Sequence, residues 1–337
     1  MSKPTTKVPK RAKVPKDAIA HRIANWFVTL PQSFKRHWMV YLMLLPFVIH
    51  TAIFTYWPMR YLEMAWMRFS PFLGIQNSPR VGWDNFYQLL FGRGSDMFFR
   101  ALQNTLILSV QELLISFPIP IILAIMYHEL RMGKFRAVSQ SILLLPRFFA
   151  EVTVVGIAIA FMRPRTGIIN VVLMRLGIIE TGIDFIALSQ YFRGIFIFLG
   201  SWQNAAFGSL IFLAALTSIS AELYESAALD GASRLRRIWH ISLPGLKDLA
   251  AIMFVLRIGG LLGTNLERAL LLQRPITYAT SDVLATFMWR TAFTQSPPNF
   301  SMGTALGLMN SLAAFILVFG ANMVKNWMSE EKGNSLF

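Results

Sequence analysis

Residues 221–246 read A-E-L-Y-E-S-A-A-L-D-G-A-S-R-L-R-R-I-W-H-I-S-L-P-G-L and form a polar segment between two long apolar runs. Loops that only connect two helices are usually a handful of residues long, so a segment of this length is expected to fold. Ser220 can cap a first helix, and Gly231 can end it. Residues 235–241 can form a second helix that crosses the first, and Pro244 stops it. The pattern predicts a short helical knob.

The surface of the predicted first helix is almost bare. Ala227, Ala228 and Gly231 carry minimal side chains, so a partner molecule could approach the backbone closely there. Glu225 and Asp230 are the polar groups beside these small residues and are candidates for contacts with that partner. The alternative is a helical hairpin that merely links two membrane-spanning helices.

The spacing of these residues resembles a known motif. Glu225-Ser226-Ala227, then Gly231, then nine residues, then Ile241-Ser242-Leu243-Pro244 is similar to the EAA loop of permease subunits of binding-protein-dependent (type I) ABC importers. Only Ser226 departs, standing where the family usually has alanine, and it is small enough to preserve the motif. The resemblance implies that residues 221–246, called the coupling loop below, sit in a groove of a separate cytoplasmic ATPase. The coupling residues that it implies are Glu225, Ser226, Ala227, Ala228, Asp230 and Gly231, with Ile241, Leu243 and Pro244 fixing the base of the loop.

The composition is that of an all-α membrane protein. Of the 337 residues, 55% are hydrophobic and only 15% are charged, and the mean hydropathy is +0.49. Cysteine is absent, which excludes disulfides, thiolate metal sites and cysteine nucleophiles. The net charge of +15 does not indicate nucleic-acid binding, because no module that combines basic and aromatic residues is visible.

Six apolar runs are long enough to cross a bilayer. They lie near residues 39–58, 102–127, 138–162, 194–219, 246–267 and 302–325. Proline or glycine occurs inside several of them, and membrane helices tolerate these residues where neighbouring helices satisfy the freed backbone groups. We expect kinked spans around a pathway, in a transmembrane permease domain that covers residues 39–326.

The two ends of the chain are polar. Residues 1–16 are rich in Lys and Pro and are expected to be a disordered basic tail, with no signal peptide. Residues 17–38 place apolar side chains at helical spacing among basic ones, which predicts an amphipathic helix on the cytoplasmic membrane surface. A solvated basic tail is the alternative for this segment. Residues 327–337 are expected to be a cytoplasmic tail.

The distribution of lysine and arginine predicts which side of the membrane each loop occupies. If the amino terminus is cytoplasmic, 18 basic residues, including all ten lysines, lie inside, and 12 lie outside. The inverted arrangement would place every lysine on the far side of the membrane. Both termini and the coupling loop are therefore predicted to be cytoplasmic.

The resemblance extends from about residue 38 to the carboxyl terminus and favours the oligosaccharide branch of the importer family. It implies a subunit of the bacterial inner membrane that forms a heterodimer with a second, homologous permease subunit. It also implies two ATPase subunits, an extracytoplasmic solute-binding protein and alternating access, and alginate-like or pectin-like oligosaccharides are among the substrates of such relatives. The segments that carry it are V-Y-L-M-L-L-P at 40–46, S-P-R-V-G-W-D-N-F at 78–86, N-T-L at 104–106, F-P-I-P-I-I-L-A at 117–124, L-L-P at 144–146 and L-R-I-G-G-L-L at 256–262.

Motifs of ATP hydrolysis and of other catalysis are not visible in the sequence. It has no G-x-x-x-x-G-K-[ST] phosphate loop, no nucleophile elbow and no H-E-x-x-H pair, and its five histidines are scattered. We interpret the chain as a non-catalytic subunit that binds no metal or cofactor of its own. ATP and Mg are expected on the partner ATPase subunits.

Polar residues inside the predicted spans are candidates for substrate contact, because a charge at mid-bilayer costs about 2.5–3.5 kcal/mol. Arg147 and Glu151 lie four residues apart on one predicted helix and are expected to neutralise each other. Arg257 is also expected to pair within the protein, and Glu112 is a further charged candidate. An aromatic face with neighbouring amide groups suits sugar rings better. The candidate residues of the substrate path are therefore Trp202, Gln203, Asn204, Asn265 and Asn310.

All twelve basic residues predicted on the outer side are arginines, against seven acidic residues there. These arginines are Arg60, Arg68, Arg80, Arg93, Arg100, Arg163, Arg165, Arg175, Arg193, Arg268, Arg274 and Arg290. Arginine binds a carboxylate through two parallel hydrogen bonds, which favours an acidic oligosaccharide as the substrate. These arginines can instead pair with the acidic residues, with lipid phosphates or with the binding protein, which leaves a neutral oligosaccharide open. Two other classes also stay open. They are a secondary transporter, which usually has broken helices in two matching halves and no docking knob, and a membrane-anchored receptor or scaffold.

Overall fold

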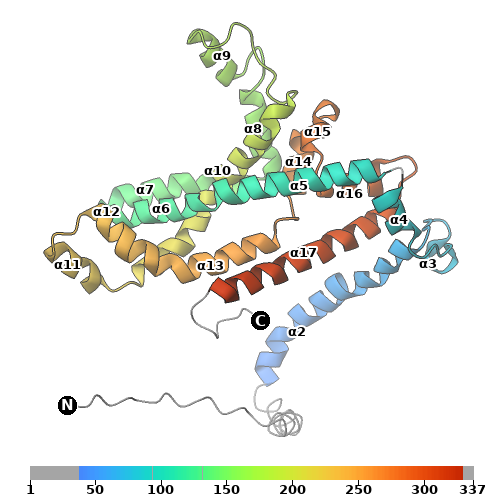
Figure 1. Ribbon diagram of the computed structural model, residues 1–337, viewed down its shortest axis with the longest axis horizontal. Helices are drawn as coiled ribbons and strands as arrows, with labels where there is room; N and C mark the ends of the chain where they lie inside the picture. Colours follow the sequence, from blue (N-terminus) through green and yellow to red (C-terminus); the bar gives the residue numbers. More distant parts are fainter. Residues whose placement is uncertain (1–37, 93, 131, 329–337) are drawn as a thin grey trace. The chain divides into compact units, whose positions relative to one another are not determined.

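The computed structural model describes residues 38–92, 94–130 and 132–328 (Figure 1), and the predictions for residues 1–37 and 329–337 lie outside these ranges. Regular structure in the described residues is helical, apart from an isolated bridge between Met67 and Arg80. The all-α prediction is therefore confirmed for this part of the chain. The chain divides into two compact units, Met1–Leu62 and Glu63–Phe337.

The first unit contains one long helical run. α2 (Trp38–Thr51) continues through a π-helical turn, η1 (Ala52–Tyr56), into the 3-10 segment η2 (Trp57–Trp66), which crosses the boundary between the units. The most apolar 18-residue window of the run Trp38–Trp66 has a mean hydropathy of 1.8, and no residue of α2 or η1 is buried. A helix that is apolar on all sides and unburied in its own chain suits a lipid environment or a partner subunit.

Three further helical runs are long and apolar enough to span a membrane. They are α5 (Ser95–Ser116) together with α6 (Pro118–Glu129), α10 (Ser189–Thr217), and α17 (Phe300–Met328). With Trp38–Trp66 these make four candidate spans in the described residues, or five if a bent pair of helices is counted as one span. The total of six spans and the cytoplasmic position of both termini stay predictions.

The bent pair replaces the kinked span predicted at 138–162. α7 (Gly133–Leu144) leads into the 3-10 turn η3 (Leu145–Phe148), and α8 (Glu151–Phe161) then departs at an angle of 100°. The two residues between them are extended, with ψ values of 141° and 146°. Pro146 lacks a backbone donor, which weakens the helix at this point. The run is interrupted rather than kinked.

The run predicted at 246–267 is also shorter as a helix than the sequence suggested. α13 (Leu243–Gly259) has 17 residues and is followed by a turn, after which α14 (Leu266–Leu272) begins. The N–H of Gly260 donates to the carbonyl of Arg257, and the N–H of Gly263 donates to that of Gly260. Glycine is suited to such tight turns because it has no side chain.

Short helices fill the remaining connections. α3 (Gly74–Asn77) and α4 (Asp84–Phe91) precede α5, and α9 (Ile168–Arg175) lies between α8 and α10. The coupling loop contains α11 (Ala221–Leu229), α12 (Arg234–Arg237) and the π-helical turn η4 (Ile238–Ser242). η5 (Pro275–Thr277), α15 (Tyr278–Ser281), α16 (Leu284–Trp289) and η6 (Arg290–Thr294) connect α14 to α17.

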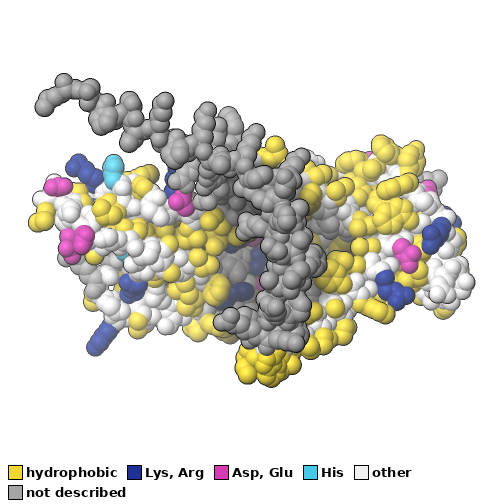
Figure 2. Space-filling view, turned by 90° about the horizontal axis from the view of Figure 1, so that it is seen from below, with side chains coloured by type: hydrophobic (Ala, Val, Ile, Leu, Met, Phe, Trp, Pro, Cys, Tyr) yellow, Lys and Arg dark blue, Asp and Glu magenta, His cyan; other side chains and the backbone are white. Residues whose placement is uncertain are grey.

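α10 is the central helix of the second unit. It packs against α5, α6 and α13 (Figure 1), and half of its most apolar window is buried. Phe196 is fully buried, which contributes about 1.5–3 kcal/mol to stability, and Gly208 lies against the ring of Pro120 on α6. The surface itself stays apolar, since hydrophobic side chains cover much of the face in Figure 2 and charged ones are sparse among them.

Candidate functional site

The first helix of the coupling loop begins and ends as its sequence predicts. The hydroxyl of Ser220 accepts a hydrogen bond from the N–H of Glu222 at 3.3 Å and so caps α11. Gly231 has a φ of +75°, a conformation that glycine adopts without strain. The N–H of Ala232 donates to the carbonyl of Ala227 at 2.9 Å, and the N–H of Gly231 donates to that of Ala228 at 3.1 Å. These two bonds form a Schellman motif, which fixes the end of the helix.

The second half of the coupling loop differs from the prediction. α12 passes through the π-helical turn η4 directly into α13, so Pro244 lies in the first turn of α13 and does not stop a helix. In the π-helical turn, the N–H of Leu243 donates to the carbonyl of Ile238, five residues back. This wider turn displaces the carbonyl that would otherwise meet the proline ring. The separate helix predicted at 235–241 is therefore wrong.

Tyr224 anchors α11 to the rest of the second unit. Its hydroxyl lies 3.0 Å from the hydroxyl of Ser242 in η4, and its ring lies 5.3 Å from the imidazole of His128 at the end of α6. The hydroxyl of Ser226 donates to the carbonyl of Glu222 within the helix at 2.8 Å, so this serine adds no projecting group to the surface. Sequence reasoning missed the anchoring residues Tyr224, Ser242 and His128, because their partners are 18 or more residues away.

The exposed surface of α11 is acidic and apolar. Glu225, Ser226, Ala228, Asp230 and Gly231 are exposed, as is Pro244, whereas Ala227, Ile241 and Leu243 are half-buried. Leu229, which the sequence did not single out, is 89% exposed at the end of the helix. No basic residue occurs in α11, so this surface would suit a basic or apolar groove.

The five candidate residues of the substrate path have separate environments. Trp202 is 43% exposed on α10, while Gln203 is buried and donates to the carbonyl of Phe149 at 3.1 Å. Asn204 donates to the carbonyl of Gly200 in its own helix. Asn265 caps α14 by accepting from the N–H of Arg268 at 3.0 Å. Asn310 is half-buried on α17, and its Oδ1 atom has no hydrogen-bond partner in the described residues.

Gln203 and Asn265 meet at Arg268, which the sequence placed among the exposed arginines of the outer side. Arg268 is only 2% exposed and forms an ion pair with Glu151 on α8. Its guanidinium lies 5.1 Å from the centre of the ring of Phe196 and donates to the side-chain oxygen Oε1 of Gln203 at 3.4 Å. This cluster joins α8, α10 and α14, and no short-range sequence pattern could have predicted it.

The ion pair expected between Arg147 and Glu151 is wrong. The chain bends between these residues, so they do not share a helix, and Glu151 pairs with Arg268 instead. The guanidinium of Arg147 lies over the ring of Phe207, 5.6 Å from its centre. A carboxylate at the first turn of α8 is also favoured by the dipole of that helix.

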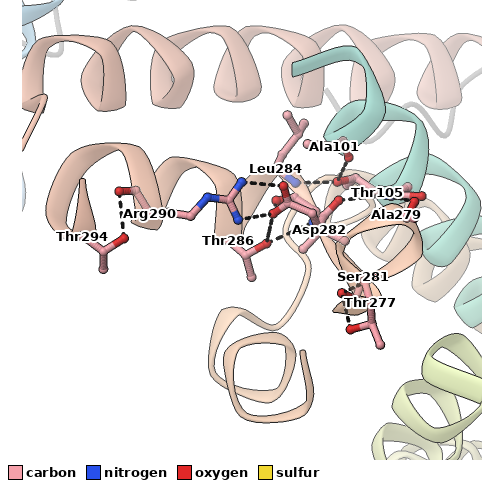
Figure 3. Close-up of polar contacts among 12 residues, drawn as sticks. Ala101, Thr105, Thr277, Ala279, Ser281, Asp282, Leu284, Thr286, Arg290 and Thr294 are labelled. Atoms are coloured by element: carbon pink, nitrogen blue, oxygen red, sulfur yellow. Dashed lines mark hydrogen bonds and ion pairs between the residues drawn. The ribbon is translucent and has the colours of Figure 1, made fainter. Parts of the chain in front are cut away.

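A second polar cluster fixes the chain between α14 and α17 (Figure 3). Arg290 binds both carboxylate oxygens of Asp282, at 2.6 and 3.0 Å, and Thr286 donates to the same carboxylate. Asn104 on α5 donates to the carbonyl of Asp282 at 3.1 Å, and the hydroxyl of Thr105 accepts from the N–H of Leu284 at 2.8 Å. The N-T-L segment thus ties α5 to α15 and α16.

The charge of Arg290 is also stabilised by this cluster. Partial burial lowers the pKa of Arg290, but the hydrogen bonds and charge of Asp282, together with Tyr278, outweigh burial and raise it. Arg193, another arginine predicted on the outer side, donates to the Oδ1 atom of Asn104 at 3.0 Å. These arginines therefore bind protein groups rather than project freely.

The described residues contain no group of three or more histidine, aspartate or glutamate side chains that could hold a metal ion. They combine several apolar helices of membrane-spanning length with a capped helical loop that presents a small, exposed surface. These features are those of a polytopic helical membrane protein.

No family model matches the chain. Protein LplB of Bacillus subtilis (strain 168) is 34% identical over 326 residues, which cover 96% of this chain and 98% of that protein. The polygalacturonan/rhamnogalacturonan transport system permease protein YteP of the same strain is 34% identical over 292 residues, covering 87% and 89% of the two chains.

A crystal structure of a bacterial alginate ABC transporter, in complex with an alginate pentasaccharide-bound periplasmic protein, contains a chain that matches with a TM-score of 0.80. That chain is 35% identical, and the match covers 90% of this chain and 99% of that one. The chain belongs to the family of permease subunits of ABC sugar transporters.

The Arg268 cluster leads to a stability prediction. A methyl group at Gly200 would overlap the guanidinium of Arg268, which cannot move aside without leaving Glu151 and Gln203. We expect Gly200→Ala to destabilise the protein by roughly 3–5 kcal/mol, the usual cost of disrupting a buried ion pair. Thermal unfolding of the purified protein in detergent measures this effect.

Gly194→Ala is the matched control, because it lies on the same helix and a methyl group there would meet no atom within 4 Å. It should leave the unfolding temperature unchanged or raise it slightly. Equal unfolding temperatures for the two variants would contradict the packing described for Gly200.

Proposed function

We propose that this chain is one of two membrane subunits of an ABC importer in the bacterial inner membrane. It forms half of the translocation path for an oligosaccharide that a solute-binding protein delivers, and it couples to separate ATPase subunits that bind ATP and Mg. The observation that carries the proposal is α11, a helix capped at both ends whose exposed surface combines small residues with acidic and apolar ones. This helix belongs to a chain whose relatives are sugar-transport permeases.

The contacts of α11 support a role in mechanical coupling. An ATPase subunit that moves α11 would also move α6 and the turn η4, because Tyr224 contacts both, and η4 leads directly into α13. We propose Glu225 and Asp230 as polar contacts with the ATPase, and Ala227, Ala228 and Gly231 as the face of close approach. ATP binding can shift the transporter between inward-facing and outward-facing states only if it favours one of them.

The substrate that we propose is an acidic oligosaccharide. The names of the relatives support this choice, since polygalacturonan and alginate are both polymers of uronic acids. Among the described residues, eight of the arginines predicted on the outer side are exposed. They are Arg60, Arg68, Arg80, Arg100, Arg163, Arg165, Arg175 and Arg274. Arg268 and Arg290 are compensated by ion pairs with Glu151 and Asp282, and the exposed Arg80 lies 3.8 Å from the carboxylate of Glu63. Arg193 is half-buried and donates to Asn104.

The coupling proposal predicts that α11 can be disabled without disturbing the long helices. Ala228→Trp would block close approach, and Glu225→Lys would reverse a charge on the same surface. We expect ATPase activity stimulated by substrate-loaded binding protein to fall about tenfold or more, because disturbing the centre of an interface commonly costs about 2 kcal/mol. Ala228 is preferred to Gly231, where any side chain would meet backbone strain.

Glu180→Lys is the control for charge reversal, because this exposed residue lies on the predicted outer side of the membrane. It should support stimulated ATPase activity equal to that of the unaltered complex. Normal stimulation in both Ala228→Trp and Glu225→Lys would refute the assignment of α11 to the ATPase interface.

The substrate proposal predicts that the carboxylates are required. Oligogalacturonate and oligo-alginate should bind the cognate solute-binding protein and stimulate the ATPase activity of the reconstituted complex, whereas their carboxyl-reduced neutral counterparts should do so weakly. Each charge-assisted hydrogen bond that is lost costs about 1.5–3 kcal/mol, so affinity should fall at least tenfold. Equal binding and equal stimulation would instead favour the import of a neutral oligosaccharide.

A further inference from the structure

Arg257 is an exposed arginine on α13 whose side chain points away from the packed face of that helix. Val255 is 5% exposed, and Gly259 lies against the side chain of Val318 on α17. Residues two positions apart on a helix differ by about 200° in direction, so Arg257 projects on the side opposite to both. Its neighbours Leu256 and Phe254 are 62% and 40% exposed. The arginine therefore lies in the middle of an apolar, exposed face.

This face lies at the depth of the apolar helices. α13 packs along α10 and α17, both of which are long and apolar enough to span a membrane (Figure 1). The ring of Phe254 contacts that of Phe117 between α5 and α6, at 5.4 Å between ring centres. A charge on lipid-facing surface at this depth is costly, and such residues almost always face a water-filled cavity or another protein group. Arg257 is thus expected to face the pathway rather than lipid.

Arg257 also ends a row of alternating charges across four helices. Glu151 on α8 pairs with Arg268 on α14, and the charges of Arg268 and Arg257 both act on Glu112 of α5. Glu112 is half-buried, with its Oε1 atom close to Gly200. Neither Glu112 nor Arg257 has an ion-pair partner within 4.0 Å in the described residues. Arg257 is the one member of the row that is exposed.

The other exposed arginine of a predicted span is placed differently. The guanidinium of Arg147 lies over the ring of Phe207, which supplies a partner inside the chain. Arg257 has no aromatic ring beneath it among the described residues. Its planar fork of donors remains available to a carboxylate, which it can bind through two parallel hydrogen bonds.

We infer that Arg257 binds the carboxylate groups of the substrate as it passes through the translocation path. The inference rests on the proposed import of an acidic oligosaccharide. A carboxylate that is passed along must be bound strongly enough to enter and weakly enough to leave. Arg257 is exposed, so water competes for its donors and a bound carboxylate can leave.

The test uses the complete complex in proteoliposomes, with the partner permease, the ATPase subunits and the solute-binding protein. The measurement is the ratio between uptake of an oligouronate and uptake of the same oligomer with part of its carboxyl groups reduced. Oligogalacturonate and oligo-alginate are both used as probes. The variants are Arg257→Gln and Arg257→Lys. Arg147→Gln is the matched control, because Arg147 is the other exposed arginine of a predicted span and lies over the ring of Phe207.

We expect the ratio to fall about tenfold in Arg257→Gln, by less in Arg257→Lys, and to stay at the unaltered value in Arg147→Gln. An unchanged ratio in Arg257→Gln, with a clear preference for the oligouronate in the unaltered complex, would overturn the role of Arg257 and leave the proposed substrate standing. If the unaltered complex takes up both oligomers equally, the proposed substrate and the role of Arg257 both fail.

Discussion

The buried ion pair between Arg268 and Glu151 joins the two places where the helices of this protein are interrupted. Glu151 begins α8 directly after the sharp bend, and Arg268 lies in α14 directly after the turn that ends α13. Each carboxylate or guanidinium alone would be costly to bury, but together they are compensated, and Gln203 adds a further hydrogen bond. The ion pair thus fixes the bend and the turn against the central helix α10. It also specifies the orientation of the two side chains, which a hydrophobic contact would not do.

Interrupted helices leave backbone groups that must find other partners in an apolar environment. The structure satisfies several of them with side chains of neighbouring helices. Gln203 donates to the carbonyl of Phe149 at the bend, and the hydroxyl of Ser109 donates to the carbonyl of Leu261 in the turn after α13. Asn104 serves the carbonyls of Ala279 and Asp282 in the same way. The polar residues of the spans are therefore largely structural, which explains why Gln203 and Asn265 lie at the buried pair.

Local patterns in the sequence predicted the local features of the structure. Ser220 and Gly231 set the two ends of α11, because a cap and a positive φ depend on a few adjacent residues. The apolar runs likewise predicted the long helices, since their signal is length and composition. The effect of proline was less predictable. Pro146 lies beside a break, whereas Pro244 is accommodated by a π-helical turn, and the difference depends on hydrogen bonds that the sequence does not display.

Contacts between distant residues could not be predicted in this way. Arg268 has the same side chain as the exposed arginines, and only the fold brings it to Glu151, 117 residues earlier. The substrate path meets the same limit, because a polar residue in a span serves equally well as a structural partner or as a contact for substrate. Burial distinguishes two of these polar residues. Gln203 is buried with its partners, while Arg257 is exposed without an ion pair in the described residues.

The route from the coupling loop to the Arg268 cluster consists of packed, short contacts. Tyr224 contacts His128 at the end of α6, and Gly208 on α10 lies against the ring of Pro120 at the start of α6. Gly245 in the first turns of α13 lies against the side chain of Ile219, directly after α10. These contacts leave little room for one helix to slide past another, so α6, α10 and the start of α13 are expected to move together. Motion that begins at α11 would then reach Gly200 and Gln203, because α10 would move as one rigid helix. The chain could bend at the two interruptions, which lie on either side of the buried ion pair.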